Sequence, residues 1–234
     1  MKRHRFILDK EIIGTSVDIT DTNVVNQISH VLRLRKGEEV VLVSRDGVET
    51  VGEIEEIHNA GVRVHILTVL EVRKHIRPDI TLYIAVLKKE NVEWVAQKAT
   101  EVGVTRIVPI RTERTVKLNI SIPRIEKIVK EASEQSGRTS VPQVLSLHTW
   151  EEALTHAKNN ASNVILSTRP HIASLQSMGI RVGIFVGPEG GWSEKELEEA
   201  LRIGCQERSL GDLTLRAETA AIIGTYIVCQ PHNE

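Results

Sequence analysis

The chain has 234 residues, of which 41% are hydrophobic and 26% charged, an ordinary composition for a soluble protein of one large or two modest domains. Its apolar runs fall short of the roughly 20 residues that a membrane span needs, and no apolar core of signal-peptide length follows its basic N-terminus. We therefore expect a cytoplasmic protein, and the formal net charge of −1 does not by itself indicate a nucleic-acid partner.

The first seventy or so residues are predicted to be rich in β-structure. Strand-like segments, most of them alternating between apolar and polar residues, cover residues 5–8, 39–44, 49–58 and 62–72. Turn residues at 45–47 and 59–61 separate the last three of these strands, and a helix is expected over residues 23–34. Three consecutive strands joined by tight turns indicate a small barrel.

The pattern changes near residues 74–78 to alternating strands and helices. Apolar strands are expected at 80–87, 106–110, 163–167 and 182–186, and helices at 91–102, 123–136, 193–203 and 216–228, with one more beginning at Thr149. Two helix starts carry a capping box, Thr149 with Glu152 and Ser193 with Glu196. Repeated strand–helix units predict an α/β domain with a mainly parallel sheet covered by helices.

Two glycine-bearing loops lie near the C-terminus. Gly187-Pro188-Glu189-Gly190-Gly191 follows an apolar strand, and Leu210-Gly211 leads toward the last helix. Glycine lets a ligand approach the backbone closely, and the ligand sites of open α/β sheets lie at such loops. The spacing matches neither G-x-G-x-x-G nor a P-loop, which argues against an ordinary dinucleotide site and against a nucleotide triphosphatase. The alternative is a plain tight connection between strand and helix.

Arg216 and Glu218 lie at the start of the last helix. The helix dipole favours glutamate at that position and disfavours arginine. Arg216 is therefore interpreted either as a residue that binds a ligand or partner group, or as half of a surface ion pair. At the end of the 123–136 helix, Gln135 and Arg138 lie close to a glycine. They belong either to a solvated face or to the wall of a pocket that reads a base edge.

Basic residues gather in several short stretches. They are Lys2, Arg3, His4 and Arg5, then Arg33, Arg35 and Lys36, then Arg111, Arg114 and Lys117, and finally Arg138. A near-neutral protein can carry one basic face, and the alternative is scattered solvated charge. The histidines show no metal-binding spacing. Cys205 and Cys229 are expected to be plain packing residues, without a disulfide.

Taken together, these segments resemble a known family. The stretch from Gly187 to Gly191, followed by Leu210-Gly211 and residues 215–220, looks like the SPOUT methyltransferases. More narrowly, it is similar to the RsmE family, which methylates N3 of one uridine in the 16S RNA of the small ribosomal subunit. Further matching pieces lie at residues 30–34, 93–104, 113–115, 131–138 and 141–142, so that the resemblance covers nearly the whole chain in order.

The resemblance implies a PUA-like RNA-binding β-barrel over residues 1–73 and a SPOUT α/β domain with a deep trefoil knot and a mainly parallel sheet over residues 74–234. It implies S-adenosylmethionine as cofactor, 16S ribosomal RNA of the small subunit as substrate, and a homodimer, with neither metal nor membrane. The cofactor-binding residues that it implies are Leu166, Ser167, Thr168, Val186, Gly187, Gly190, Gly191, Leu210, Gly211 and Leu215.

Methylation at N3 of uridine imposes its own demands, because N3 carries a proton at neutral pH. An arginine can stabilise the charge that develops on the base oxygens, and a carboxylate, Glu189 or Glu134, can accept the proton. The catalytic candidates are Arg216, Glu189 and Arg138. The predicted RNA-binding residues are Arg3, Arg5, Arg33, Arg35, Arg114 and Gln135.

The chain departs from the family at one point. Asp212-Leu213-Thr214 stands where the family usually has Pro-Arg-Ile, which removes a proline and a positive charge beside the cofactor.

Two alternative functions stay open. One is a knotted methyltransferase for another RNA base or a ribose 2′-oxygen, and the other is an RNA-binding ribosome-assembly factor without catalysis.

Overall fold

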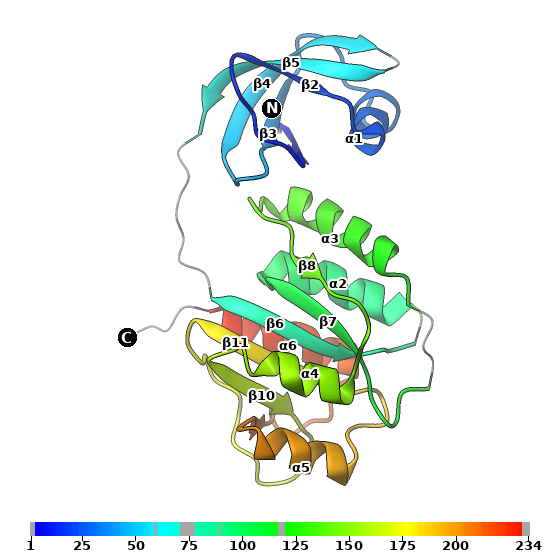
Figure 1. Ribbon diagram of the computed structural model, residues 1–234, viewed down its shortest axis with the longest axis vertical. Coiled ribbons are helices and arrows are strands. Elements are labelled where there is room, and N and C mark those ends of the chain that lie inside the picture. The colour runs from blue at the N-terminus through cyan, green and yellow to red at the C-terminus, as the bar shows by residue number, and fades with distance from the viewer. Residues whose placement is uncertain (1–2, 59, 71–77, 89, 117–119, 231–234) are drawn as a thin grey trace. The chain divides into compact units, whose positions relative to one another are not determined.

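The computed structural model describes residues 3–58, 60–70, 78–88, 90–116 and 120–230; its ribbon is drawn in Figure 1. Contacts divide the chain into two units. One comprises Met1–His75 with Ser133–Ser140, and the other comprises Ile76–Ala132 with Val141–Glu234. The predicted domain boundary after residue 73 lies outside the described residues, as do residues 74–77 of the predicted change of pattern.

In its described residues, the N-terminal unit contains a five-stranded sheet in the order β1-β3-β4-β5-β2. Its strands are β1 (His4–Ile7), β2 (Ser16–Ile19), β3 (Glu39–Val43), β4 (Glu49–His58) and β5 (Gly61–Val69). The consecutive strands β3, β4 and β5 pair antiparallel, as their turns predict, while β1 pairs with β3 in parallel. Strand β2 was not predicted.

The predicted helix over residues 23–34 is shorter in the structure. Helix α1 (Thr22–Asn26) continues into a π-helical turn, η1 (Gln27–Val31). The carboxylate of Asp21 caps its start by accepting the N–H of Asn23 at 2.8 Å. Arg33 has a φ of 56°, in the left-handed region, so the backbone leaves the helix there.

Residues 133–140 group with the N-terminal unit because they contact β1. The backbone N–H of Ile7 donates a hydrogen bond to Glu134 Oε1 at 3.0 Å. The guanidinium of Arg138 donates from Nε to the carbonyl of Ser140 at 3.1 Å. The exposed fractions of Glu134 and Arg138 are only 8% and 7%. Both charged side chains are therefore part of the packing of this unit.

In its described residues, the C-terminal unit contains a parallel sheet of seven strands. Six of them follow the order β12-β10-β11-β6-β7-β8, and the seventh, β9, also pairs with β7. Its strands are β6 (Asp79–Ala85), β7 (Arg106–Arg111), β8 (Gln143–Val144), β9 (His148–Thr149), β10 (Ser162–Leu166), β11 (Arg181–Val186) and β12 (Gln206–Arg208). Every one of these pairings is parallel, as predicted. The prediction missed β8, β9 and β12, because strands of two or three residues carry no periodic signal.

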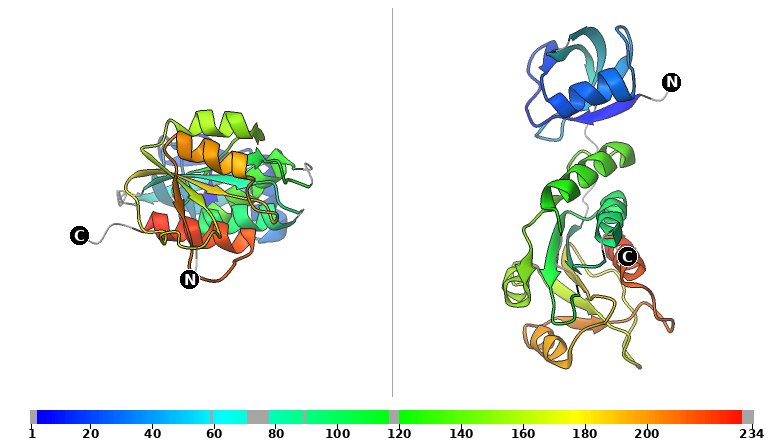
Figure 2. Two further views of the ribbon diagram at one scale, coloured as in Figure 1. Left: turned by 90° about the horizontal axis from the view of Figure 1, so that it is seen from below. Right: turned by 90° about the vertical axis from the view of Figure 1, so that its right-hand side faces the viewer.

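Helices cover both faces of this sheet. They are α2 (Glu90–Val102), α3 (Ile122–Ser136), α4 (Trp150–Ala157), α5 (Glu194–Arg202) and α6 (Ala217–Cys229). One apolar core includes residues of α2, α3 and α6, and a second core on the opposite face includes residues of α4 and α5. The left view of Figure 2 shows α6, in red, on one side of the sheet and α4 and α5 on the other. The predicted α/β class is confirmed.

Three further findings concern the Cys205 thiol, metal ligands and membrane-spanning helices. Burial raises the pKa of the Cys205 thiol to about 12, so this side chain stays protonated and unreactive at neutral pH. Across the described ranges, no group of three or more His, Cys, Asp or Glu side chains is arranged to hold a metal ion. None of the helices described here has the length and apolar character required to cross a membrane.

Candidate functional site

Three loops meet at the carboxyl end of the parallel sheet because β12, β10 and β11 are neighbours. One loop follows β10 at Ser167, the second is Gly187–Gly191 after β11, and the third covers residues 209–216 between β12 and α6. Every predicted cofactor-binding residue lies in one of these loops or at the end of the strand before it. The structure therefore brings the predicted cofactor-binding residues to one edge of one sheet.

Glycine is favoured at the three positions of the second loop for different physical reasons. A Cβ at Gly187 would lie 3.1 Å from the Trp192 indole, and one at Gly190 would lie 3.3 Å from Arg114 Cβ. Gly191 has a φ of 69° and donates its N–H to the carbonyl of Pro188 at 2.8 Å, which closes a tight turn. The backbone conformation and the close packing both favour glycine.

The second loop is joined to the ends of three strands. Trp192 donates its Nε1–H to the carbonyl of Leu166, the last residue of β10, at 2.8 Å. Glu189 Oε1 accepts the N–H of Lys88, beyond β6, at 3.3 Å. Arg114, beyond β7, donates from Nη1 to the carbonyl of Gly190 at 2.9 Å. These contacts hold the loop against the ends of three strands.

We expect Trp192→Phe to weaken both folding and ligand binding at these loops. The change removes the indole N–H and leaves the buried Leu166 carbonyl without its donor, which costs about 1–3 kcal/mol of unfolding free energy. Trp150→Phe is the matched control, because Trp150 Nε1 binds Glu199 on α5 at 2.9 Å.

Urea unfolding and calorimetry with S-adenosylmethionine check this expectation. Both variants should lose stability, whereas only Trp192→Phe should weaken cofactor binding. Equal cofactor affinity in the two variants would mean that the Trp192–Leu166 contact does not shape the site.

The first loop, which begins at Ser167, is hydrogen-bonded to the end of β12. The N–H of Ser167 donates to the carbonyl of Arg208 at 2.9 Å, and Ser167 Oγ accepts the N–H of Arg169 at 3.2 Å. The Arg169 guanidinium binds the Glu194 carboxylate at the start of α5, and this hydrogen bond raises the pKa of Arg169. Thr168 is exposed beside these contacts.

The third loop is open to solvent. Asp212, Leu213 and Thr214 are exposed, while Leu210 and Leu215 are half-buried. Gly211 has a φ of 110°, and no heavy atom lies within 4 Å of the position that its Cβ would take. Half-buried leucines beside an uncovered backbone suit a small ligand that has both an apolar and a polar part.

The three predicted catalytic residues belong to two different units. Arg216 is the N-cap residue of α6, with its side chain 87% exposed and 4.0 Å from the Glu218 carboxylate. Glu189 lies in the glycine loop of the same unit. Arg138 is buried in the other unit, and Glu134, the alternative proton acceptor, is buried there too. Burial indicates packing roles for Arg138 and Glu134, and a catalytic role for Arg138 stays a prediction.

Most of the predicted RNA-binding residues belong to the N-terminal unit. Arg3 pairs with Glu39 at 2.6 Å, and the half-buried Arg5 pairs with Glu49 at 2.8 Å. The side chains of Arg3, Arg33, Arg35 and Gln135 are exposed. Arg114 is exposed in the C-terminal unit, and its RNA contact, like those of the others, stays a prediction.

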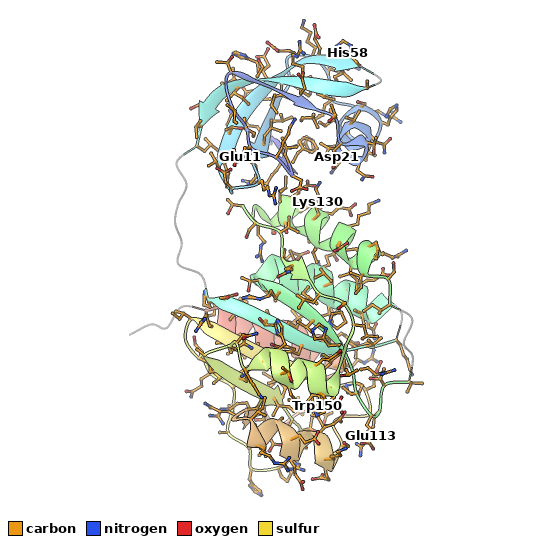
Figure 3. The ribbon with its side chains drawn as sticks, viewed as in Figure 1. Glu11, Asp21, His58, Glu113, Lys130 and Trp150 are labelled. Carbon is orange, nitrogen blue, oxygen red and sulfur yellow. The ribbon has the colours of Figure 1, made fainter. Side chains whose placement is uncertain are left out.

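Sequence reasoning missed two residues of this site. Trp192 was not assigned a role, and Glu196 was identified only as half of a capping box. Glu196 Oε1 also accepts the N–H of Glu113 at 2.8 Å; Glu113 is labelled in Figure 3. The Ser-x-x-Glu pattern identifies the cap, but it contains no signal for a bond to a distant loop.

Comparison with known proteins gives a family match for the larger unit. A model of the RNA methyltransferase domain matches residues 74–228. The ribosomal RNA small subunit methyltransferase E of Rickettsia conorii is 30% identical over 233 residues, which cover 95% of this chain and 93% of that protein.

Two solved structures resemble the whole chain. A ribosomal RNA small subunit methyltransferase E from Neisseria gonorrhoeae, bound to S-adenosyl methionine, is 30% identical with a TM-score of 0.84 and covers 96% of this chain and 95% of its own. A methyltransferase from Legionella pneumophila, in complex with the same cofactor, is 28% identical with a TM-score of 0.88 and covers 97% of each chain.

Proposed function

The chain belongs to the RNA methyltransferase domain family and, within it, to the ribosomal RNA small subunit methyltransferase E family, and from this we propose its reaction in detail. It transfers a methyl group from S-adenosylmethionine to N3 of one uridine, U1498 in the numbering of the RNA, in the 16S RNA of the small ribosomal subunit. The observation that supports this function best is that the loops after β10, β11 and β12 meet at the carboxyl edge of the parallel sheet.

The residues of those loops fit the cofactor. When bound, S-adenosylmethionine supplies an electrophilic methyl group. A ligand can approach the backbone N–H and C=O groups closely at the glycines of these loops, which are Gly187, Gly190, Gly191 and Gly211. The half-buried Leu210 and Leu215 provide apolar contact. Leu166, Ser167, Thr168 and Val186 complete the proposed cofactor-binding set.

The chemical demand on the protein is to favour the uridine anion. Arg216 is proposed to lie beside the base oxygens, where its positive charge stabilises the negative charge that forms as N3 loses its proton. Glu189 is proposed to accept that proton, directly or through a water molecule, because its carboxylate lies in the glycine loop. Holding the base in line with the methyl donor adds a further, larger contribution by orientation.

The finer features of the fold are proposed on the same basis. The five-stranded sheet of the N-terminal unit is proposed to be a PUA-like RNA-binding barrel. A trefoil knot in the C-terminal unit is supported by the contacts of Ser209, which forms a parallel bridge with Ser174 and donates its N–H to the carbonyl of Ala173 at 3.0 Å. Residues 172–175 thus pack on the chain directly after β12, at the start of the loop that leads to α6.

A homodimer is also proposed, through helices α2 and α6, which pack against each other. Trp94 on α2 is 45% exposed, and Ile223 and Tyr226 on α6 are 38% and 52% exposed. Ile223 and Tyr226 are three residues apart on α6 and so share a face, and exposed apolar side chains of this size suit an interaction surface. We place this dimer in the cytoplasm, where small ribosomal subunits are assembled.

Tyr226→Glu is expected to convert the dimer to a monomer in sedimentation, because a charge would be buried at the contact. Leu201→Glu on α5, an exposed leucine outside this helix pair, is the control and should leave the dimer intact. A wild-type protein that sediments as a monomer at micromolar concentration would contradict the proposal.

Mass spectrometry of nucleosides from RNA methylated by the protein tests the proposed base. We expect N3-methyluridine. A 2′-O-methyl nucleoside or another methylated base would instead identify a related knotted methyltransferase. Binding of the RNA without binding of S-adenosylmethionine, measured by calorimetry, would identify a non-catalytic assembly factor.

A further inference from the structure

A buried carboxylate lies at the start of α5, directly after the glycine loop. Glu196 is 4% exposed, and its two oxygens accept from two different segments of the chain. Oε2 accepts the N–H of Ser193 at 2.8 Å, which completes the capping box, and Oε1 accepts the N–H of Glu113 at 2.8 Å. A hydrogen bond to an ionised acceptor is stronger than one between neutral groups, so this carboxylate joins two loops firmly.

The second capping box of the chain shows what a cap alone requires. At the start of α4, the carboxylate of Glu152 accepts the N–H of Thr149 at 2.7 Å, and Thr149 Oγ1 accepts the N–H of Glu152 at 3.2 Å. Within the described residues, Glu152 binds no other segment, and its side chain is exposed. The bond from Glu196 to Glu113 is therefore additional to helix capping.

The loop that Glu196 holds is itself a fixed turn. Thr112 donates its N–H to Thr115 Oγ1 at 3.0 Å, and Thr115 donates its N–H to the carbonyl of Thr112 at 3.2 Å. Between them, Arg114 extends over the glycine loop and donates from Nη1 to the carbonyl of Gly190 at 2.9 Å. The position of Arg114 thus depends on how the turn is anchored.

We propose that Glu196 is a positioning residue for methyl transfer, which acts by anchoring the turn of residues 112–115 so that Arg114 stays over Gly190. The inference rests on the proposed function. A guanidinium carries five N–H donors, and the bond to Gly190 uses one of them. The remaining donors on this exposed side chain suit a phosphate or a base edge of the RNA beside the cofactor loop.

Glu196→Gln tests the anchor with little change of shape. A glutamine amide presents one accepting oxygen and one donating nitrogen. We expect the oxygen to keep the local capping bond from the Ser193 N–H, so that the NH2 group opposes the N–H of Glu113. We expect kcat/KM for the RNA to fall by about tenfold to a hundredfold, as for a misplaced group near the chemistry. Glu152→Gln, the matched control, should stay within twofold of the wild type.

A double-mutant cycle separates positioning from general loss of stability. If Glu196 acts through Arg114, Glu196→Gln should cost little further activity once Arg114→Ala is present, so the two effects are not additive. Calorimetry should show that the affinity for S-adenosylmethionine changes less than kcat/KM for the RNA. Additive losses, or equal losses in Glu196→Gln and Glu152→Gln, would overturn the proposal.

Amide hydrogen exchange provides a readout that does not depend on catalysis. The Glu113 amide should exchange at least about tenfold faster in Glu196→Gln than in the wild type. Its exchange rate should be unchanged in Glu152→Gln. Unaltered exchange at Glu113 would overturn the anchor. A wild-type protein that fails to methylate RNA while this exchange pattern holds would instead contradict the proposed function and leave the anchor standing.

Discussion

Arg216→Ala is expected to lower the rate of methyl transfer by about 10²–10³-fold, the range found when one preorganised charge-stabilising donor is removed. The side chain is 87% exposed, and its nearest carboxylate, that of Glu218, is 4.0 Å away. Within the described residues, it makes no capping hydrogen bond to α6. A positive charge at a helix N-terminus opposes the helix dipole, so the substitution should leave the thermal midpoint unchanged or slightly raised.

The control for this variant is Arg181→Ala. Arg181 is also exposed, but it begins β11 at the end of the strand opposite to Gly187. Full methyl transfer by Arg216→Ala, with normal binding of S-adenosylmethionine, would contradict the assignment. The charge beside the base would then come from another residue.

Gly183→Ala is expected to destabilise the C-terminal unit by about 3 kcal/mol, the upper range for overpacking of a core. A Cβ on this central strand residue would lie 2.2 Å from Asn163 Oδ1, 2.4 Å from Asn160 Nδ2 and 3.0 Å from the Tyr83 ring. Asn160 Nδ2 donates to Asn163 Oδ1 at 2.8 Å and to Tyr83 Oη at 3.2 Å. The added methyl group would break these hydrogen bonds in the interior.

The same network explains why relaxation is difficult. Tyr83 Oη is 2.7 Å from His156 Nδ1, and burial raises the pKa of Tyr83 to about 12. The phenol is therefore neutral, and its hydroxyl needs partners within the protein. Movement of either asparagine would leave buried polar groups unpaired.

Gly224→Ala on α6 is the matched control. Its Cβ would crowd the end of the Leu166 side chain, at 2.9 Å, while Leu175 and Ile184 would lie at ordinary contact distances of 3.8 and 4.0 Å. A leucine methyl group can rotate away, and alanine favours a helix over glycine by about 1 kcal/mol. Urea unfolding should therefore show a small change for Gly224→Ala and a large loss for Gly183→Ala. A loss below about 0.5 kcal/mol in Gly183→Ala would show that the network adapts to the methyl group.

The elements that dominate this fold have strong local signals. The apolar runs of β6, β10 and β11 and the capping boxes at Thr149 and Ser193 allowed the parallel sheet and its helices to be predicted. The Gly187–Gly191 loop was located correctly because glycines, a proline and the cap at Ser193 define it in a few consecutive residues. The shortest strands escaped prediction because their pairing depends on neighbours that are distant in the sequence.

The contacts that build the site were less predictable. No local sequence pattern predicts the hydrogen bond from Trp192 to Leu166 or the one between Glu113 and Glu196, because the two partners of each bond are far apart in the sequence. For the same reason, the polar residues on either side of Gly137 did not reveal that Glu134 and Arg138 are buried. Charge and spacing identify candidate residues, whereas burial decides which of them can reach a substrate.

Transfer of a labelled methyl group from S-adenosylmethionine to small ribosomal subunits that lack the modification, with naked 16S RNA assayed in parallel, tests the central claim most directly. We expect label in the 16S RNA, at a single nucleotide, and its loss in Arg216→Ala. Bound cofactor with no label in the RNA of either substrate would contradict the claim that this protein is a ribosomal RNA methyltransferase.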